Sequence, residues 1–304
     1  MSEMGALTAR GLVALFLGFG VIPVVVSAGE YETEIAAWRT KRAEALQAEG
    51  GWLSVAGLFW LKEGPNRFGT AAENEIVLPP VSTPASAGVF EFHDGRTTVS
   101  LAAGMKGQLG KNPVSAPTEM KPDTDGGELL TLGDLTIQVI KRADRFGIRL
   151  RDRNSTYRKS FSGLEWYPVS DEWKITARFI AYSPARPLRI SSVIGTSETM
   201  TSPGYATFSV GGKEVRLDGV LEAPDSTSLF FIFRDSTSGK ETYGAGRFLY
   251  ADLPRQGIVV LDFNKAYNPP CAFTPYATCP VPPQQNWLAV AIPAGEKNYR
   301  GLAH

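Results

Sequence analysis

The sequence predicts a mainly β protein that begins with one helix. From Trp52 onward, short apolar runs alternate with period two, as half-buried strands do. Glycine, proline, asparagine and aspartate separate these runs at the spacing typical of a sandwich or barrel. Strands do not alternate with helices, which disfavours a parallel doubly wound sheet. We therefore expect an N-terminal helix, a β-sandwich, and then a second antiparallel sheet or half-barrel.

Residues 1–28 have the pattern of a secretory signal peptide. Arg10 precedes the apolar run Gly11–Val26, and Val26-Ser27-Ala28 supplies the small residues of a cleavage site. The alternative is an uncleaved membrane anchor, although the run is shorter than the ~20 apolar residues that span a bilayer. We expect cleavage after Ala28 and a mature protein that is exported, periplasmic or secreted, with no membrane attachment.

Residues 29–51 form the predicted N-terminal helix segment, with the helix itself over Tyr31–Ala48 and a stop at Gly50-Gly51. Its apolar stripe, which we expect to pack against a sheet, consists of Ile35, Trp38, Ala45 and Leu46.

Two series of strands follow, with the polar stretch Asn154–Phe161 as the expected link between them. Residues 52–153, the predicted sandwich, contain Gly57–Leu61, Glu75–Leu78, Val89–Phe92, Thr97–Leu101, Leu129–Leu132, Thr136–Lys141 and Gly147–Arg151. Residues 154–304, the predicted second β domain, contain Trp173–Tyr182, Leu188–Ile194, Ala206–Val210, Glu214–Leu217, Leu229–Arg234, Arg247–Tyr250, Ile258–Phe263 and Trp287–Ile292. Tight hairpins are predicted at His93–Arg96 and at Val210–Lys213.

Composition and motifs disfavour several classes of function. Lys plus Arg equals Asp plus Glu at 31 each, so no basic field exists to hold nucleic acid. The chain has no G-x-S-x-G motif and two histidines, His93 on a predicted turn and His304 at the end, which disfavours a Ser-His nucleophile. Asp123–Glu128 lacks the full ligand pattern of a calcium loop, and no helix follows the glycine-rich run Tyr243–Arg247. We predict no cofactor and no metal site.

The most informative segment is Leu261–Lys297, which is rich in proline and contains both cysteines. Proline excludes a helix or a central strand there. The aromatic residues in or beside it argue against disorder: Phe263, Tyr267, Phe273, Tyr276 and Trp287. We interpret this segment, the Cys/Pro-rich loop, as a rigid loop that shapes a site.

Export makes a disulfide between Cys271 and Cys279 the favoured state of the two thiols. The alternatives are a redox pair, which favours C-x-x-C spacing, and a metal site, which needs further ligands.

Charged residues gather beside this loop. Asp262 at a strand end is placed to pair with Arg247, and Glu296 follows an apolar run that leads to the same region. These residues can form either a functional site or an ion-pair network that holds an irregular loop. Asn264, Asn268 and Asn286 are expected to satisfy backbone groups that the prolines leave unpaired.

At these residues the chain resembles the bacterial and archaeal domain-of-unknown-function family 1684. The resemblance is carried by Glu241–Phe248, Leu261–Asn264, Tyr267–Cys271, Thr278–Pro280 and Ala294–Lys297, and upstream by Leu58–Leu61, Asn66–Gly69 and Asn74–Leu78. It covers most of the mature chain and implies no assigned activity. Arg67-Phe68-Gly69 and Asn74–Leu78 also resemble, faintly, a forkhead-associated β-sandwich, as a similarity of fold alone.

Three functional hypotheses follow. The favoured one is a binding protein for a small polar ligand, a sugar or a peptide, held by Arg247, Asp262, Asn264, Tyr267, Asn268, Phe273, Glu296 and Lys297. The second is a hydrolase of an extracellular substrate in which Asp262 and Glu296 form a carboxylate pair. The third is a structural scaffold in which the loop seals one end of a barrel.

Overall fold

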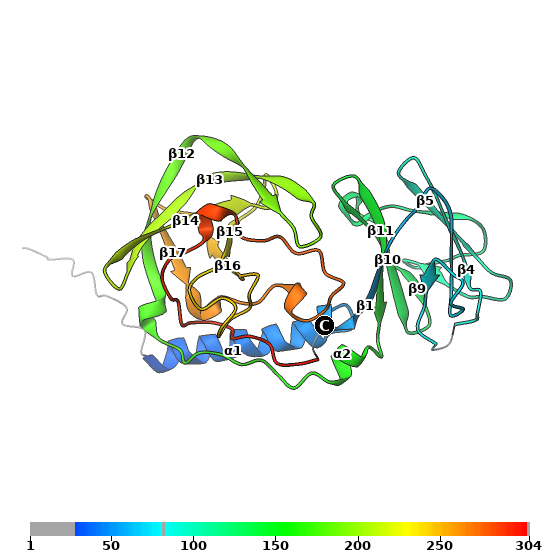
Figure 1. Cartoon of the computed structure of the whole chain (residues 1–304), viewed down its shortest axis with the longest axis horizontal. Helices are drawn as coiled ribbons and strands as arrows, with labels where there is room; N and C mark the ends of the chain where they lie inside the picture. The colour runs from blue at the N-terminus through cyan, green and yellow to red at the C-terminus, as the bar shows by residue number, and fades with distance from the viewer. Residues whose placement is uncertain (1–27, 81–82, 303–304) are drawn as a thin grey trace, which may run out of the picture.

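A computed structural model describes residues 28–80 and 83–302. The predicted signal peptide, apart from Ala28, and His304 lie outside the described residues. The fold is mainly β with an N-terminal helix and several antiparallel sheets, as predicted (Figure 1).

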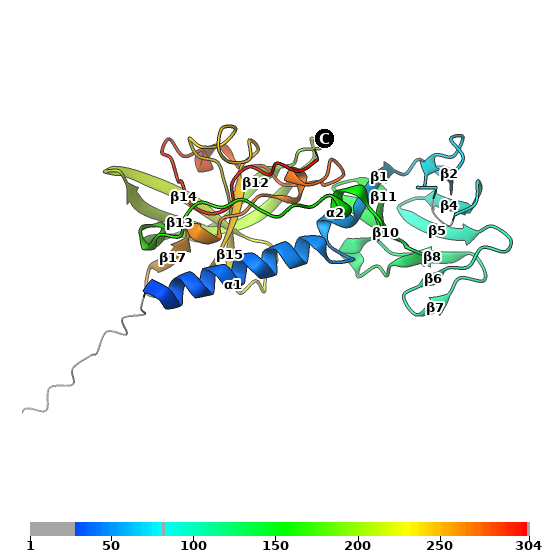
Figure 2. The ribbon, with the colours of Figure 1, turned by 90° about the horizontal axis from the view of Figure 1, so that it is seen from below.

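Helix α1 spans Ala28–Gln47 and is followed by the short 3-10 helix η1, Trp52–Ser54. Tyr31, Ile35 and Leu46 are buried. Figure 2 shows α1 lying along the C-terminal part of the chain, where it contacts η4, Phe263–Lys265, which begins the Cys/Pro-rich loop. No helix in the described ranges is both long and apolar enough to cross a membrane.

The N-terminal β unit consists of two sheets packed on one apolar core. The first has the order β1-β11-β10-β9-β6-β7: β1 Val55–Trp60, β6 Gln108–Leu109, β7 Asn112–Pro113, β9 Leu130–Leu132, β10 Leu135–Arg142 and β11 Arg145–Asp152. The second has the order β3-β2-β4-β5-β8: β2 Gly64–Gly69, β3 Ile76–Val77, β4 Gly88–His93, β5 Arg96–Leu101 and β8 Thr118–Met120. Phe68 and Phe90 stack in the shared core with ring centroids 4.6 Å apart. The faint forkhead-associated likeness of this unit stays a prediction.

Two short helices lie between this unit and the next, α2 Thr156–Lys159 and η3 Asp171–Trp173. A further 3-10 helix, η2 Asp123–Asp125, lies within the sandwich between β8 and β9.

The C-terminal β unit is built on one six-stranded sheet with the order β16-β15-β14-β13-β12-β17. Its strands are β12 Lys174–Ser191, β13 Ser197–Val210, β14 Lys213–Leu221, β15 Ser228–Phe233, β16 Arg247–Asp252 and β17 Ile258–Asp262. The edge strands β16 and β17 contact each other, so the sheet curls into a nearly closed half-barrel. Alternation along β15 sends Phe231 and Phe233 into the enclosed core, and Phe230 and Ile232 to the outer face.

Both predicted hairpins are confirmed. Asp94 and Gly95 turn between β4 and β5 with φ of 50° and 78°, and Gly211 and Gly212 turn between β13 and β14 with φ of 56° and 76°. Two consecutive positive φ values are the signature of the tight turn that matches the twist of paired strands.

Two strand predictions need correction. Trp173–Tyr182 and Leu188–Ile194 are not separate strands, because β12 runs through both with a register shift between Ala181 and Arg186. Trp287–Ile292 is not a strand, although Leu288, Val290 and Ile292 are buried in alternation. Its backbone bonds irregular partners, since the N–H of Ile292 donates to the Asp235 carboxylate at 2.6 Å rather than to a neighbouring strand.

Candidate functional site

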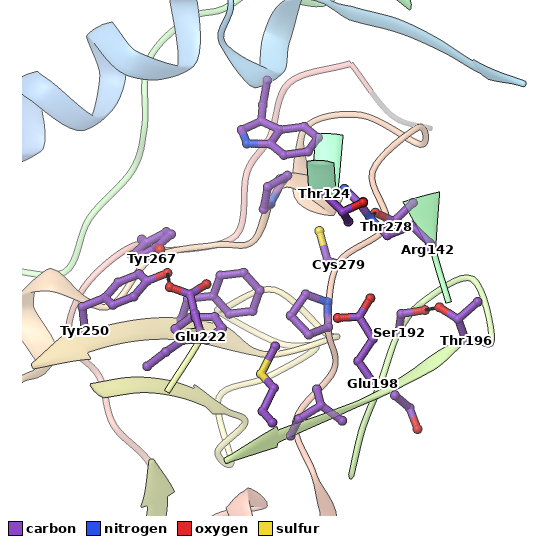
Figure 3. A pocket seen from close by; sticks show the side chains of 18 of the residues that line it. Thr124, Arg142, Ser192, Thr196, Glu198, Glu222, Tyr250, Tyr267, Thr278 and Cys279 are labelled. Carbon is purple, nitrogen blue, oxygen red and sulfur yellow. Dashed lines mark hydrogen bonds between the residues drawn. The ribbon is translucent and has the colours of Figure 1, made fainter. Parts of the chain in front are cut away.

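A cavity of about 570 Å³ lies between the N-terminal sandwich and the outer face of the half-barrel (Figure 3). The sandwich contributes Thr124, Lys141 and Arg142 to the lining. The half-barrel contributes Ile190, Ser191, Ser192, Glu198, Met200, Glu222, Phe230, Phe248 and Tyr250, with Thr196 from the turn between β12 and β13. The Cys/Pro-rich loop contributes Tyr267, Pro270, Thr278, Cys279 and Pro280. Arg42 of α1 and Trp52 of η1 complete the lining.

The half-barrel side of the cavity is aromatic with a polar rim. Phe230 and Phe248 pack edge to face, with ring centroids 4.9 Å apart. The Tyr250 hydroxyl donates to Glu222 Oε2 at 2.8 Å, and its ring stacks parallel to Tyr267. Burial raises the pKa of both tyrosines, that of Tyr267 to about 12, so both hydroxyls remain protonated at neutral pH.

The sandwich side of the cavity is basic. Arg142 forms an ion pair with Asp123, Nη1 to Oδ2 at 2.9 Å, and donates from Nε to Thr278 Oγ1 at 3.0 Å. This second bond ties the sandwich to the Cys/Pro-rich loop. Asp123, Arg142 and Thr278 are therefore held together by these two contacts on this side of the cavity.

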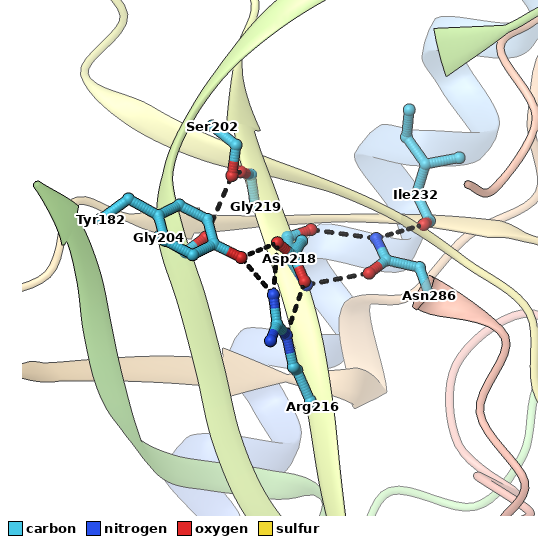
Figure 4. A network of polar contacts seen from close by, with 8 residues as sticks. All are labelled: Tyr182, Ser202, Gly204, Arg216, Asp218, Gly219, Ile232 and Asn286. Atoms are coloured by element: carbon cyan, nitrogen blue, oxygen red, sulfur yellow. Dashed lines mark hydrogen bonds and ion pairs between the residues drawn. The ribbon is translucent and has the colours of Figure 1, made fainter. Parts of the chain in front are cut away.

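The Cys/Pro-rich loop is anchored by side-chain amides, as predicted for its asparagines. Asn286 lies in the 3-10 helix η6, Gln284–Asn286; it accepts the Asp218 N–H and donates to the carbonyl oxygens of Asp218 and Ile232 (Figure 4). Asn264 donates to the Ser170 carbonyl oxygen, and Asn268 donates to the Lys297 carbonyl oxygen. Each amide replaces a ladder partner that the irregular backbone lacks.

The structure does not contain the predicted disulfide. Cys271, in the 3-10 helix η5 (Pro270–Ala272), and Cys279 are free and buried. They are neighbours, because the Cys271 N–H donates to Cys279 Sγ at 3.1 Å. The bond from Cys279 lowers the pKa of Cys271, and burial raises that of Cys279. The predicted disulfide is therefore not shown, although the two cysteines are neighbours.

Arg247 does not point into the cavity and does not pair with Asp262. Its side chain is fully buried, with Nη2 3.3 Å from Asp235 Oδ2 and further bonds to the carbonyl oxygens of Ala294 and Ile292. The preceding Gly246 has φ of 101°, and a Cβ added there would lie 2.5 Å from the Phe233 carbonyl oxygen and 2.6 Å from Pro282 Cγ, so the backbone is closely packed at this point. Through these contacts Arg247 anchors the C-terminal end of the Cys/Pro-rich loop at Ile292 and Ala294.

Asp262 faces α1 rather than the cavity. Its Oδ1 accepts the Tyr31 hydroxyl at 2.7 Å and the Asn264 N–H at 3.2 Å, and its Oδ2 lies 3.5 Å from Lys265 Nζ. Burial, together with the bond to Asp262, raises the pKa of Tyr31. Asp262 thus begins the loop by capping η4 and holding the first turn of the helix.

Glu296 is fully buried, and its carboxyl group is held by α1 and the loop. Oε2 lies 3.5 Å from Arg42 Nε, and Oε1 accepts the Asn268 amide at 2.8 Å. Burial raises the pKa of Glu296 to about 7, and Arg42 and Asn268 partly oppose this shift. The neighbouring Lys297 places Nζ 4.7 Å from the Tyr167 ring centre, away from the cavity lining.

The residues predicted to bind a ligand therefore separate into two groups. Tyr267 lines the cavity, whereas Arg247, Asp262, Asn264, Asn268, Glu296 and Lys297 do not, and Phe273 is buried against Tyr299. Arg247, Asp262 and Glu296 each form a separate ion pair, with Asp235, Lys265 and Arg42 respectively, which favours the structural interpretation of these charges. Apart from Tyr267, the cavity is lined by residues that are distant from these predicted positions in the sequence, such as Arg142 and Glu222.

Basic residues also occupy the outer face of β11. Arg145, Arg149 and Arg151 lie an even number of residues apart, which places all three on the sheet face opposite the sandwich core. None of them lines the first cavity, so this pattern does not identify Lys141 or Arg142. A second cavity of about 500 Å³, lined by Arg151, Arg153 and Glu49 among others, lies further along this unit. Within the described ranges, no group of three His, Cys, Asp or Glu side chains is arranged to hold a metal ion.

The fold and the site define a two-part β protein whose C-terminal half-barrel carries a proline-rich loop that packs partly into its enclosed core and partly on its outer face. Residues 159–297 match the family described as Protein of unknown function (DUF1684), and over this segment the chain belongs to that family. The match covers the half-barrel and the Cys/Pro-rich loop. It is thus shorter than predicted and leaves out α1 and the sandwich.

The chain is also similar to the solution NMR structure of an uncharacterized protein from Haloarcula marismortui. The identity is 28%, the match covers 46% of this chain and 78% of that chain, and the TM-score is 0.40, at which the similarity carries no argument about the site. No curated protein matches the chain.

Proposed function

We propose that the protein binds a small polar ligand, a sugar or a peptide, in the cavity between the sandwich and the half-barrel. The observation that carries this proposal is the cavity itself, about 570 Å³ in volume and walled by the Cys/Pro-rich loop. Cavities of ~300–1,000 Å³ with apolar walls and a few polar groups are the usual form of ligand sites. Phe230 and Phe248 supply apolar wall, and Glu222, Tyr250, Thr278 and Arg142 supply the polar groups.

The carboxylate-pair hydrolase has less support. Glu296 is fully buried against Arg42, Asp262 is bound to Tyr31, and neither carboxylate lines the cavity. A substrate in the cavity would therefore have no contact with either carboxylate. The scaffold hypothesis is disfavoured by the presence of the cavity.

The test is a thermal-shift screen with neutral sugars and short peptides, repeated on a variant with a filled cavity. Met200 lines the cavity from β13 and is partly buried. Met200→Trp adds volume there and should abolish any ligand-induced rise in melting temperature, whereas the volume-conserving Met200→Leu should keep it. Equal responses of both variants to every ligand would reject the cavity as the site.

We further propose that the chain is exported and that its dithiol becomes a disulfide in the oxidising compartment. The apolar run before Ala28 supports export, and the contact between Cys271 and Cys279 supports pairing. Each thiol loses a proton, a sulfur–sulfur bond forms, and the two electrons pass to a thiol–disulfide oxidant of the compartment.

N-terminal sequencing and mass measurement of protein from fractionated cells test both points. A chain that begins at Gly29 and lacks two hydrogens relative to its reduced form is expected. An intact N-terminus with two titratable thiols after denaturation would contradict both.

A further inference from the structure

Arg149 of β11 is a buried cation without a carboxylate partner among the described residues. Its exposed fraction is 3%, and no ion pair forms between it and an acidic side chain in the described ranges. Nε has no hydrogen-bond partner, and Nη2 makes one long bond, 3.4 Å, to Thr278 Oγ1. Leaving a buried charge uncompensated is strongly unfavourable, so such a group normally has a partner.

The surroundings of Arg149 increase this imbalance. Arg142 and Arg151 add like charge, and Asp123, the nearby carboxylate, is already paired with Arg142. Burial and these guanidinium groups lower the pKa of Arg149 to about 10, so it remains charged at neutral pH. The Asp123 carboxylate is therefore close to three guanidinium groups, those of Arg142, Arg149 and Arg151.

Arg149 lies directly behind the cavity wall. Its guanidinium carbon is 5.0 Å from the centre of the Trp52 ring, and Thr278 and Cys279 are its other neighbours on this side. All three line the cavity. Figure 3 shows Thr278 and Arg142 side by side on this wall, across the cavity from Tyr250 and Glu222.

Thr278 adds a further donor. Its Oγ1 accepts N–H bonds from both Arg142, at 3.0 Å, and Arg149, at 3.4 Å. Because both lone pairs are engaged, its O–H is left to donate, and the described residues include no acceptor for it. Arg142 and Thr278 thus form a wall rich in donors, with the charge of Arg149 directly behind it, and this arrangement suits an oxyanion.

We propose that the ligand of this cavity carries an oxyanion, a carboxylate or a phosphate, which binds at the wall formed by Arg142 and Thr278, in front of the buried Arg149. The inference rests on the proposed binding function and narrows it to acidic ligands. The Arg142 guanidinium and the Thr278 hydroxyl match the acceptor pattern of such a group, and the anion supplies the negative charge that the buried Arg149 behind them lacks.

The experiment compares N-acetylglycine with its neutral amide, N-acetylglycinamide, by thermal shift and titration calorimetry at constant ionic strength. Inorganic phosphate forms a second arm and distinguishes a phosphate from a carboxylate. We expect at least one anion to raise the melting temperature saturably, and the amide to bind about tenfold more weakly or worse than the acid if carboxylate is the preferred group.

The diagnostic variant is Arg149→Met, which keeps much of the side-chain length and removes the charge. It should raise the melting temperature of the ligand-free protein, since it removes an uncompensated buried charge, and it should abolish stabilisation by the anion. Arg151→Met is the matched control: Arg151 lies on the same face of β11, also with an unpartnered Nε, but lines the second cavity. This control should keep anion binding.

Three outcomes overturn the inference: no anion stabilises the native chain, Arg149→Met binds the anion as tightly as the native chain, or Arg149→Met lowers the ligand-free melting temperature. The last would identify Arg149 as a structural residue. The proposed function survives each of these outcomes if a neutral sugar or peptide still binds in a manner that Met200→Trp abolishes.

Discussion

Arg42 and Glu296 are in contact across nearly the whole length of the chain, with Nε of one 3.5 Å from Oε2 of the other. Arg42 also lies over the Tyr267 ring at 4.6 Å, donates to the Asn268 carbonyl oxygen at 2.9 Å, and lines the cavity. One side chain of α1 therefore connects the buried carboxyl group, the Cys/Pro-rich loop and the candidate site.

The Glu296 carboxyl group should make stability depend on pH. Its pKa rises from 4.5 to about 7 on folding, so between these values the native state binds more protons than the unfolded state. The free energy of unfolding contributed by this group is therefore highest at low pH and falls as pH rises towards 7. At ~1.4 kcal/mol per pKa unit, the loss is on the order of 3 kcal/mol.

Denaturant unfolding of the native chain and of Glu296→Gln from pH 5 to pH 8 measures this contribution. The variant should gain stability relative to the native chain as pH rises. The same change at the exposed Glu214 is the control and should give a constant difference. A stability difference for Glu296→Gln that does not change with pH would contradict the assignment. A variant that loses stability relative to the native chain as pH rises would contradict it as well.

Arg247→Met should destabilise the fold by roughly 3–5 kcal/mol, because it leaves Asp235 buried without its cation. Asp235 keeps bonds from Thr237 and from the Ile292 N–H, so adding Asp235→Asn should recover part of the loss. Arg234→Met, at a partly exposed arginine stacked on Trp287, should cost less than about 1 kcal/mol. Equal losses for Arg234→Met and Arg247→Met would show that the buried pair has no special role.

Gly246→Ala should cost more than about 2 kcal/mol, since Gly246 has φ of 101° and an added Cβ would lie 2.5 Å from the Phe233 carbonyl oxygen. Gly244 offers a matched comparison two residues earlier. A Cβ there meets nothing closer than 3.6 Å, so Gly244→Ala should be close to neutral. Thermal unfolding of both variants decides the point, and a neutral Gly246→Ala would remove the argument for close approach.

Asn286→Ala should destabilise the protein by about 3 kcal/mol or more, because it leaves three buried backbone groups without partners. Gln285→Ala, at an exposed neighbour in the same 3-10 helix, should stay within about 0.5 kcal/mol of the native chain. Hydrogen exchange should also show faster exchange of the Asp218 amide in the first variant alone. Unchanged protection there would mean that the amide does not anchor the loop.

Local features of the fold were predictable because they depend on short-range chemistry. Period-two alternation predicted the β class, and Asp94-Gly95 and Gly211-Gly212 predicted two turns, since positive φ selects these residues. The strand predicted at Trp287–Ile292 shows the limit of this reasoning. Alternating apolar residues show which side chains are buried. The same alternation arises in a segment whose backbone is hydrogen-bonded to a side chain such as Asp235 instead of to a neighbouring strand.

The candidate site was predictable only in part. The Cys/Pro-rich loop does form one wall of the cavity, yet the charged residues beside it point elsewhere. Whether Glu296 faces a solvent-filled space or Arg42 depends on where α1 docks, and Arg142 reaches Thr278 only once the two β units meet. Such contacts join residues far apart in the chain, and no local pattern encodes them.

Arg42 of α1 contacts Glu296, and Tyr31 of α1 contacts Asp262. The first helix therefore cannot complete its docking until the C-terminal segment of the chain has been synthesised. Ribosome-bound chains that still lack Glu296 should therefore carry α1 undocked, with its apolar stripe available to chaperones. A fragment cut to residues 159–297 would likewise lack α1, so that Glu296 loses Arg42 and Asp262 loses the Tyr31 hydroxyl. Full-length chains are accordingly the material in which the half-barrel should be studied.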